Sequence, residues 1–345
     1  MKNIVMCFDR TRGRSGPCDA TNAAALLSLL DDTCPDRQIT WGDAGEAGLR
    51  RGVAAVEEYR ASIVDAYLFL VDWWEPDDKI FLFGVGRGAY CAQALARLLG
   101  TVGVLPAGSD NVLEYALSAY VLPRTRRTLQ EWRRVAGLAW KLAGAGDGEI
   151  AVPVQFLGLW DTLKVPGLPR RSPAGQVDGA LTNVVAGRHA VAIDGGYGPF
   201  GEYLVSPDAG QVEQVWFRGS HCDIAGGSGA CWPLADITLD WMLDGAVKAG
   251  AIVRAGSDDA APAPTERDAL AEGAHTIPLR RLPGNALVHA SVESYLRSHP
   301  RYWRRLPAQV VWADPEWVAR SERLVGVAEA PAAAVEPEPL TAVAS

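Results

Sequence analysis

Apolar, β-rich segments mark the expected strands of this chain. They occur at Ile4–Phe8, Ile80–Phe83, Val152–Trp160 and Val212–Trp216. Predominantly apolar segments of this kind are typical of strands that are covered on both faces. Helical spacing of apolar residues fills much of the chain between them. The pattern therefore predicts an α/β fold with a mostly parallel sheet and helices on both of its faces.

Three helices are expected around the first two strands. Thr21–Leu30 has the pattern of an amphipathic helix, with Asp19 or Thr21 as its N-cap. Gly52–Trp74 predicts a longer helix that leads into the strand at residue 80, and Ala89–Leu99 predicts the helix that follows this strand.

The domain boundaries follow from changes in pattern and composition. One α/β domain is expected over residues 1–310, with a C-terminal extension over 311–327 and a disordered tail over 328–345, which is rich in Ala, Pro and Glu. A polar, linker-like loop spans about residues 254–274. A helical insertion over about 108–146 fits either a cap over an active site or ordinary core helices. Its apolar positions are Leu113, Leu117, Tyr120, Leu129, Trp132, Val135 and Trp140.

Composition narrows the class of protein. The chain has 345 residues, of which 48% are hydrophobic, so it is long enough to bury a full core. Its formal net charge of -8 argues against a general nucleic-acid or anionic-membrane surface. The basic clusters at Arg124–Arg127 and Arg133–Arg134 are interpreted as solvated helix faces. No nucleic-acid partner is expected.

The chain start and the cysteines bear on location and cofactors. A strand begins almost at Met1, which leaves no room for a signal peptide, and no run of about 18 apolar residues predicts a transmembrane segment. A cytoplasmic location is the resulting expectation. The six cysteines show no Cys-x-x-Cys spacing, so neither a metal site nor a disulfide framework is predicted, and no cofactor is expected.

The segment Lys79–Tyr90 has the form of a nucleophile elbow without a nucleophile. In α/β-hydrolases an apolar strand runs into Gly-x-Ser-x-Gly and then a helix, and the glycines permit the strained turn that exposes the serine. Here Gly84 and Gly88 are the outer glycines, but the central residue is Gly86. Glycine has no atom that attacks an ester, so covalent catalysis at this position is excluded.

The same glycines allow a second interpretation. Gly84, Gly86 and Ala89 also spell Gly-x-Gly-x-x-Ala between a strand and a helix, which is a dinucleotide-binding pattern. That pattern requires a second strand that ends in Asp or Glu about 20 residues later. The stretch from Thr101 to Asp110 supplies only a short Val-Gly-Val-Leu-Pro piece.

Several motifs, in order over about residues 1–307, resemble one family. It contains the catalytic domain of type VI secretion phospholipase effectors of the first Tle group and related bacterial α/β-hydrolases. The family elbow is usually Gly-Phe-Ser-Arg-Gly-Ala-Tyr, and here Gly84–Tyr90 reads Gly-Val-Gly-Arg-Gly-Ala-Tyr. The other matching segments are Lys2–Gly13 with Thr21 and Asn22, Phe156–Thr162, Arg188–Asp194, Val215–Gly227, Val288–Val292 and Tyr302–Pro307.

The resemblance implies a triad in the order Ser, Asp, His. It assigns the nucleophile position to Gly86, the acid to Asp161 and the base to His221, with Asp194 and Asp223 as alternative acids. The remaining histidines, His189, His275, His289 and His299, are interpreted as structural.

The departures from the family pattern lie at the expected chemistry. Arg10 and Arg12 stand where the family has glycines, in the loop with Thr11 that normally supplies an oxyanion-hole N–H. Two interpretations of these arginines stay open: they form an anion-binding pocket with Arg87, or they point to solvent or pair with nearby carboxylates.

Our leading hypothesis is a catalytically impaired hydrolase whose cleft binds a small-molecule or lipid-like ligand or a partner. The competing hypotheses are an active ester or phospholipid hydrolase that uses water or a displaced nucleophile, and the dinucleotide-binding protein. Cys91, Ser220 and Cys222 are unfavourable as displaced nucleophiles, because Cys91 is expected in the core and the other two flank His221 on its own loop.

Overall fold

The computed structural model describes most of the expected α/β domain. The described residues are 1–9, 20–43, 53–106, 150–163, 181–196, 201–205, 211–254 and 280–317, with residues 108, 133–134, 137 and 141. An eight-stranded sheet runs through them in the order β2-β1-β3-β4-β5-β6-β7-β8, and every neighbouring pair is parallel. The strands are β1 (Asn3–Phe8), β2 (Gln38–Gly42), β3 (Lys79–Val85), β4 (Val154–Trp160), β5 (Gly187–Ala192), β6 (Val212–Phe217), β7 (Leu287–His289) and β8 (Val311–Ala313).

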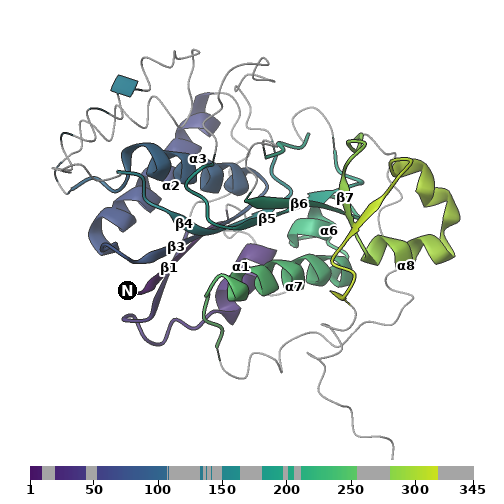
Figure 1. The fold of residues 1–345 in the computed structure, drawn as a ribbon, viewed down its shortest axis with the longest axis horizontal. Helices are drawn as coiled ribbons and strands as arrows, with labels where there is room; N and C mark the ends of the chain where they lie inside the picture. Colours follow the sequence, from purple (N-terminus) through teal and green to yellow (C-terminus); the bar gives the residue numbers. More distant parts are fainter. Residues whose placement is uncertain are drawn as a thin grey trace, which may run out of the picture.

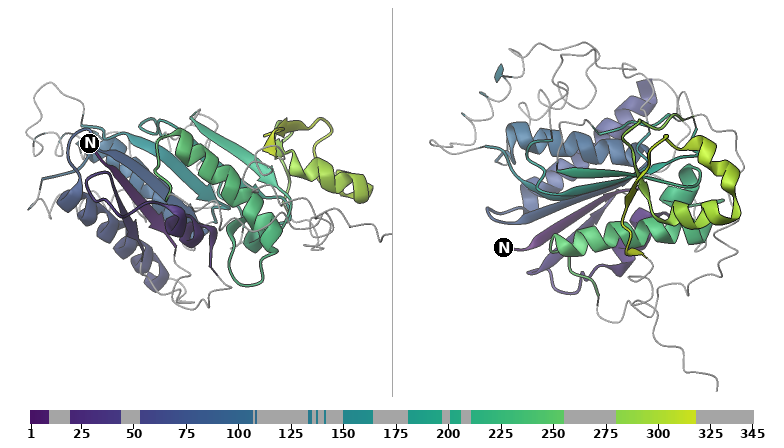
Figure 2. Two further views of the ribbon diagram at one scale, coloured as in Figure 1. Left: turned by 90° about the horizontal axis from the view of Figure 1, so that it is seen from below. Right: turned by 45° about the vertical axis from the view of Figure 1, so that its right-hand side comes forward.

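Helices cover the sheet on both faces (Figures 1 and 2). α2 (Val53–Trp73) and α3 (Arg87–Val102) pack on one face, while α1 (Asn22–Leu29), α6 (His221–Ala225) and α7 (Trp232–Lys248) pack on the other. Helix α8 (Ser291–Ser298) and the 3-10 helix η4 (Pro300–Arg305) lie at the β7–β8 end of the sheet.

Alternating side chains of one strand enter two separate cores. On β1, Ile4 and Met6 belong to the core beneath α2 and α3, whereas Val5 and Cys7 belong to the core beneath α1 and α7. Because successive side chains of a strand point to opposite faces, a strand covered by helices on both faces must be apolar at every position. This requirement explains the predominantly apolar segments in the sequence.

The structure confirms the predicted fold class, and within the described residues strands and helices lie at the predicted segments around residues 4–8, 21–30, 52–74, 80–83, 89–99, 152–160 and 212–216. Thr21 is the N-cap of α1, since its Oγ1 accepts a hydrogen bond of 3.3 Å from the Ala24 N–H. The alternative cap, Asp19, lies outside the described residues, as do most of the insertion at 108–146, the polar loop after residue 254 and the tail at 328–345. The sheet continues to β8, which begins in the stretch predicted as a C-terminal extension.

The strand order reverses at β1. The chain adds β2 on one side of β1 and then returns to add β3 on the other side. In open parallel sheets such a reversal leaves a crevice at the carboxyl ends of the two central strands, and ligands bind there. The carboxyl ends of β1 and β3 therefore border the expected site.

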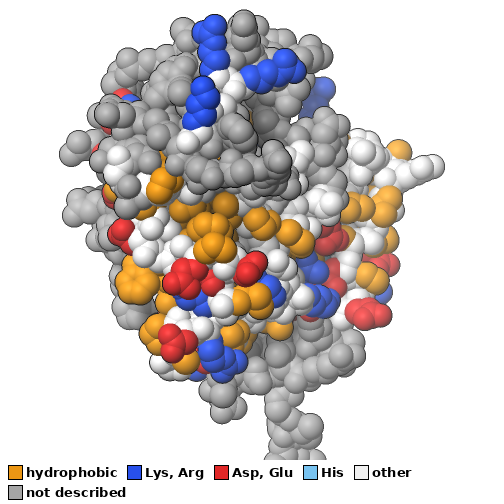
Figure 3. Space-filling view, turned by 60° about the vertical axis from the view of Figure 1, so that its left-hand side comes forward, with side chains coloured by type: hydrophobic (Ala, Val, Ile, Leu, Met, Phe, Trp, Pro, Cys, Tyr) orange, Lys and Arg blue, Asp and Glu red, His pale blue; other side chains and the backbone are white. Residues whose placement is uncertain are grey.

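The surface of the described residues mixes apolar and charged side chains. Figure 3 shows a band of hydrophobic side chains on one face, with acidic and basic side chains next to it. Leu68 and Trp73 on α2 are among the exposed large apolar side chains. Within the described part of the chain, no helix has the length and apolar character that crossing a bilayer requires.

Candidate active site

The turn between β3 and α3 is as tight as a nucleophile elbow requires. A Cβ at position 84 would lie 2.6 Å from the Ala89 backbone nitrogen, and a Cβ at position 88 would lie 2.1 Å from the Phe8 carbonyl oxygen. Neither contact is sterically allowed, so both outer positions need glycine. The outer glycines of the motif are thus explained by the packing of α3 against β1 and by the close approach of the end of β3 to the first turn of α3.

Gly86 occupies the apex of this turn. Its φ is 56° and its ψ is -110°, a combination that residues with a Cβ rarely adopt. The Gly86 N–H donates to the Trp160 carbonyl at 2.8 Å, and the Gly86 carbonyl accepts from the Leu163 N–H at 3.0 Å. These two hydrogen bonds hold the apex between the ends of β3 and β4.

The imidazole of His221 faces Gly86. A Cβ built at position 86 would lie 3.0 Å from His221 Cε1 and 3.1 Å from His221 Nε2. Contacts this short are tighter than usual for a Cβ, so the ring already lies close to the glycine backbone. A side chain at position 86 would require the ring to move by a few tenths of an ångström.

A short helix carries His221 at its first position. Ser220 caps α6, and its N–H and Oγ both donate to Asp223 Oδ2, at 2.7 and 2.8 Å. The other Asp223 oxygen accepts from the Cys231 N–H at 2.8 Å. Asp223, one of the alternative acids, is therefore occupied with capping α6 and does not contact the imidazole through these bonds.

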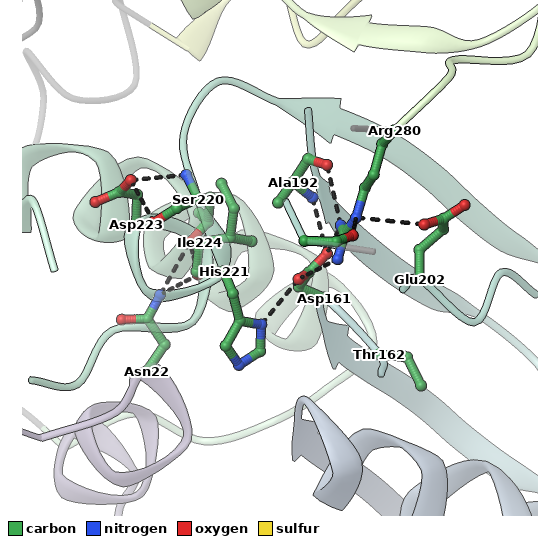
Figure 4. A network of polar contacts seen from close by, with 12 residues as sticks. Asn22, Asp161, Thr162, Ala192, Glu202, Ser220, His221, Asp223, Ile224 and Arg280 are labelled. Atoms are coloured by element: carbon green, nitrogen blue, oxygen red, sulfur yellow. Dashed lines mark hydrogen bonds and ion pairs between the residues drawn. The ribbon is translucent and has the colours of Figure 1, made fainter. Parts of the chain in front are cut away.

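Asp161 lies directly behind His221 (Figure 4). It follows β4, has a φ of 40° and is completely buried. Its Oδ2 accepts a hydrogen bond of 2.8 Å from His221 Nδ1, and its Oδ1 accepts one of 3.0 Å from the Ala192 N–H. With Nδ1 bonded to the carboxylate, Nε2 is the ring nitrogen that faces Gly86.

Arg280, which the sequence analysis missed, forms a bidentate ion pair with Asp161. Its Nη1 donates to Oδ1 at 2.5 Å and its Nη2 to Oδ2 at 3.1 Å, and the guanidinium is completely buried. Burial alone would raise the pKa of Asp161, but Arg280 and the hydrogen bond from His221 together hold it well below its usual range. The sequence offers no signal for Arg280, because it follows a polar stretch of sequence and belongs to no motif.

Asp194, the other alternative acid, ties two distant segments together. Its side chain accepts hydrogen bonds of 2.9 Å from the Gly219 N–H and from the Tyr302 hydroxyl, and it pairs with Arg305. It therefore fixes the loop before His221 to the C-terminal η4 segment.

The structure also locates the other singled-out side chains. His189 is buried and hydrogen-bonded to Gln214 and Thr162, and burial lowers its pKa to about 4. Cys91 lies in the core between α3 and the sheet. Arg87, the first residue of α3, is half-buried. His289 stacks on Phe217 and His299 on Tyr295, whereas Arg10, Thr11, Arg12 and His275 lie outside the described residues.

Nothing in the described ranges points to a metal centre. No group of three or more His, Cys, Asp or Glu side chains there is arranged to hold a metal ion. For the dinucleotide interpretation, α3 extends to Val102, and the next described strand, β4, begins only at Val154. The strand that should follow the glycine motif at about 20 residues is thus not among the described residues.

Comparison with known proteins identifies relatives. The model of one protein family, described as the catalytic domain of Tle1-like phospholipase effectors of the type VI secretion system, matches residues 2–245. An uncharacterised protein from Saccharomyces cerevisiae, YEL023C, is 29% identical over 229 residues, which cover 60% of this chain and 33% of the yeast protein. The chain therefore spans about a third of this relative's length.

Two solved structures are also similar. The first, an uncharacterised protein from Pseudomonas aeruginosa, has 14% sequence identity, a TM-score of 0.43 and coverage of 73% of this chain and 46% of the other. The second is a Tle1 effector bound to the VgrG spike of the type VI secretion system. It has 15% identity, a TM-score of 0.38 and coverage of 66% of this chain and 51% of the other.

Proposed function

We propose that this chain, which belongs to the family of Tle1-like phospholipase effector catalytic domains, is a catalytically impaired member whose cleft binds a ligand. The observation that carries the proposal is the combination of an intact elbow backbone with glycine at its apex. The base and acid positions, His221 and Asp161, are hydrogen-bonded to each other beside that apex.

The chemistry that is lost is nucleophilic attack. A serine hydrolase needs a hydroxyl between the imidazole Nε2 and the substrate carbonyl. At position 86 this hydroxyl does not exist, so no acyl-enzyme forms there. Among the described residues near the site, Ser220 donates its hydroxyl to Asp223, and burial raises the pKa of the Cys222 thiol, which disfavours the reactive thiolate.

The features that remain suit binding. The glycine apex, the Nε2 atom of His221 and the side chain of Leu163 meet at the carboxyl end of β3, which borders the crevice that the reversal of strand order creates between β1 and β3. A neutral Nε2 accepts a hydrogen bond from a ligand hydroxyl or amide. The family relationship suggests a lipid-like ligand with ester groups, and such a ligand would stay intact in this cleft.

A second candidate function is weak hydrolysis through water. The retained bond between Asp161 and His221 orients the imidazole as a general base, and glycine leaves room for a water molecule beside it. Triads without their nucleophile keep only residual catalysis, about 10³ to 10⁴ over water from binding and the oxyanion hole. Ester hydrolysis at the rate expected of a phospholipase with an intact triad would be absent.

Restoring the nucleophile tests the loss of chemistry. We expect Gly86→Ser to give slow hydrolysis of a short acyl ester, and the additional changes Arg10→Gly and Arg12→Gly to increase it, because glycine in that loop permits an oxyanion hole. Gly86→Ala is the matched control, since it adds the Cβ without a hydroxyl. Ester hydrolysis by the unmodified chain that His221→Ala abolishes would instead establish the water mechanism.

Calorimetric titration with a non-hydrolysable ether analogue of a short-chain phospholipid tests binding. We expect saturable binding that Gly86→Leu abolishes, because the leucine fills the space beside His221. Gly284→Leu is the control, since a Cβ at position 284 meets no atom within 4 Å. Equal binding by both variants would contradict a ligand site at this cleft.

A further inference from the structure

A chain of alternating charges extends from the surface to the imidazole (Figure 4). Glu202 lies 3.3 Å from the Nε atom of Arg280, whose other nitrogens hold Asp161 at 2.5 and 3.1 Å. Asp161 in turn accepts the hydrogen bond of 2.8 Å from His221 Nδ1. The four side chains come from four separate segments of the sequence.

Backbone contacts hold both Arg280 and Glu202 in place. The Arg280 guanidinium donates to the carbonyls of Ala192 and Gly196, at 3.0 and 3.1 Å. Glu202 forms an isolated antiparallel bridge with Leu163, two residues after Asp161. The arrangement is therefore built into the strand ends that carry the site.

Burial makes these charges strongly coupled. Asp161 and Arg280 have no exposed side-chain surface, while the Glu202 side chain is 26% exposed. At low local dielectric a neighbouring charge acts far more strongly than in water. A lone buried carboxylate would stabilise the imidazolium form of His221, but the guanidinium of Arg280 offsets that charge, and the Glu202 carboxylate offsets the guanidinium.

We propose that Arg280 and Glu202 are positioning residues that set the charge of His221, with Arg280 favouring the neutral imidazole and Glu202 favouring the imidazolium. The inference deepens the proposed function, because it concerns the same site and determines whether the cleft presents a hydrogen-bond acceptor or a cation. It concerns the ligand-free protein and does not require any ligand or turnover.

Other titratable and charged side chains also lie near His221. Asp223 and Cys222 lie on its own helix, His189 is hydrogen-bonded to Thr162 next to Asp161, and Arg87 begins the helix that follows Gly86. The variants below alter none of them, so a change in His221 titration reports on the charge chain.

The test is an NMR titration of the His221 ring in full-length, histidine-labelled protein, with His221→Asn to assign the signal. We expect Glu202→Gln to lower the pH at which the His221 ring titrates, because it leaves the guanidinium unbalanced. We expect Arg280→Gln to raise the pH at which the His221 ring titrates, because it frees the full charge of Asp161. Shifts in opposite directions are expected only from a chain of charges. A general loosening of the structure around His221 would shift its titration in the same direction in both variants.

Matched controls remove equal charges elsewhere. Glu213→Gln breaks a pair in which Arg188 is largely buried and Glu213 is 43% exposed, and Arg254→Gln breaks an exposed pair with Asp32. Both should leave the His221 titration unchanged. If Arg280→Gln does not fold, Arg280→Lys keeps the charge, and it should keep a titration midpoint closer to that of the unmodified chain than Glu202→Gln does. An unchanged midpoint in Glu202→Gln, or equal shifts in the same direction for the Glu202 and Arg280 variants, would overturn the proposal while leaving the proposed function untouched.

Discussion

Gly86 adopts a backbone conformation that strains any residue with a Cβ. Its φ of 56° and ψ of -110° are accessible to glycine at little cost. A nucleophilic serine accepts such strain because the turn exposes its hydroxyl. Where position 86 carries no nucleophile, the strained conformation gives no catalytic benefit, and glycine adopts it without strain.

We therefore expect Gly86→Ser to destabilise the fold by about 1 to 3 kcal/mol, the typical cost of a residue held in a sparsely populated region. The close approach of a Cβ to His221 adds to this cost. Urea unfolding of Gly86→Ser and Gly86→Ala measures it, and the two should agree because both add a Cβ. A serine variant that is more stable than the unmodified chain would contradict this explanation.

His189 should make stability fall in mild acid. Burial lowers its pKa from 6.5 to about 4 in the folded chain, so the unfolded chain binds more protons between these values. The contribution of His189 to the free energy of unfolding is fully present above pH 6.5 and is lost as the pH falls toward 4. The total loss is about 3 kcal/mol.

The measurement is urea unfolding of the unmodified chain and of His189→Gln over that pH window. The variant should lack most of the loss in stability, whereas His299→Gln serves as a control at a half-buried histidine. The same pH dependence in the unmodified chain and in His189→Gln would show that His189 is not its source.

At the scale of elements, the contact between α3 and β1 explains the outer glycines. A Cβ at position 88 would lie 2.1 Å from the Phe8 carbonyl oxygen, which is backbone and cannot rotate away. We expect Gly88→Ala to destabilise by more than about 4 kcal/mol, at the extreme of single substitutions. Gly284→Ala lies in open space and should stay within about 0.5 kcal/mol of the unmodified chain. Similar denaturation midpoints for the two variants would contradict the proposed packing.

The sequence predicts elements best where both faces of a strand are buried. β1 and β3 lie within the sheet and read as apolar runs, so they were predicted. The edge strand β2 reads Gln-Ile-Thr-Trp-Gly and is mostly half-buried, which gives no such run. β7 and β8 have three residues each, which is too short for a periodic signal.

The same reasoning separates the site residues that the sequence identifies from those it misses. Asp161 and His221 follow strands within recognisable motifs, and the structure brings them together, although their catalytic roles stay predictions. Arg280 and Glu202 reach the site from loops, and only tertiary contacts show their relation to Asp161. Charge pairing across distant loops leaves no local pattern in a sequence.

At the scale of the whole molecule, one parallel sheet collects the site. Gly86 follows β3, Asp161 follows β4 and His221 begins α6 after β6, and all of these strands end at the same edge because they run parallel. The sheet thus holds the hydrolase arrangement through its backbone, independently of which side chain stands at position 86. The proposed loss of the nucleophile is therefore compatible with an intact fold.

The most direct test of the central claim is labelling of the native chain with a fluorophosphonate probe, followed by intact-protein mass spectrometry. The account predicts no covalent adduct on the unmodified chain, because position 86, which faces His221, is a glycine and has no hydroxyl. It predicts an adduct on the variant that combines Gly86→Ser, Arg10→Gly and Arg12→Gly, and loss of that adduct when His221→Ala is added. A stoichiometric adduct on the unmodified chain would contradict the account.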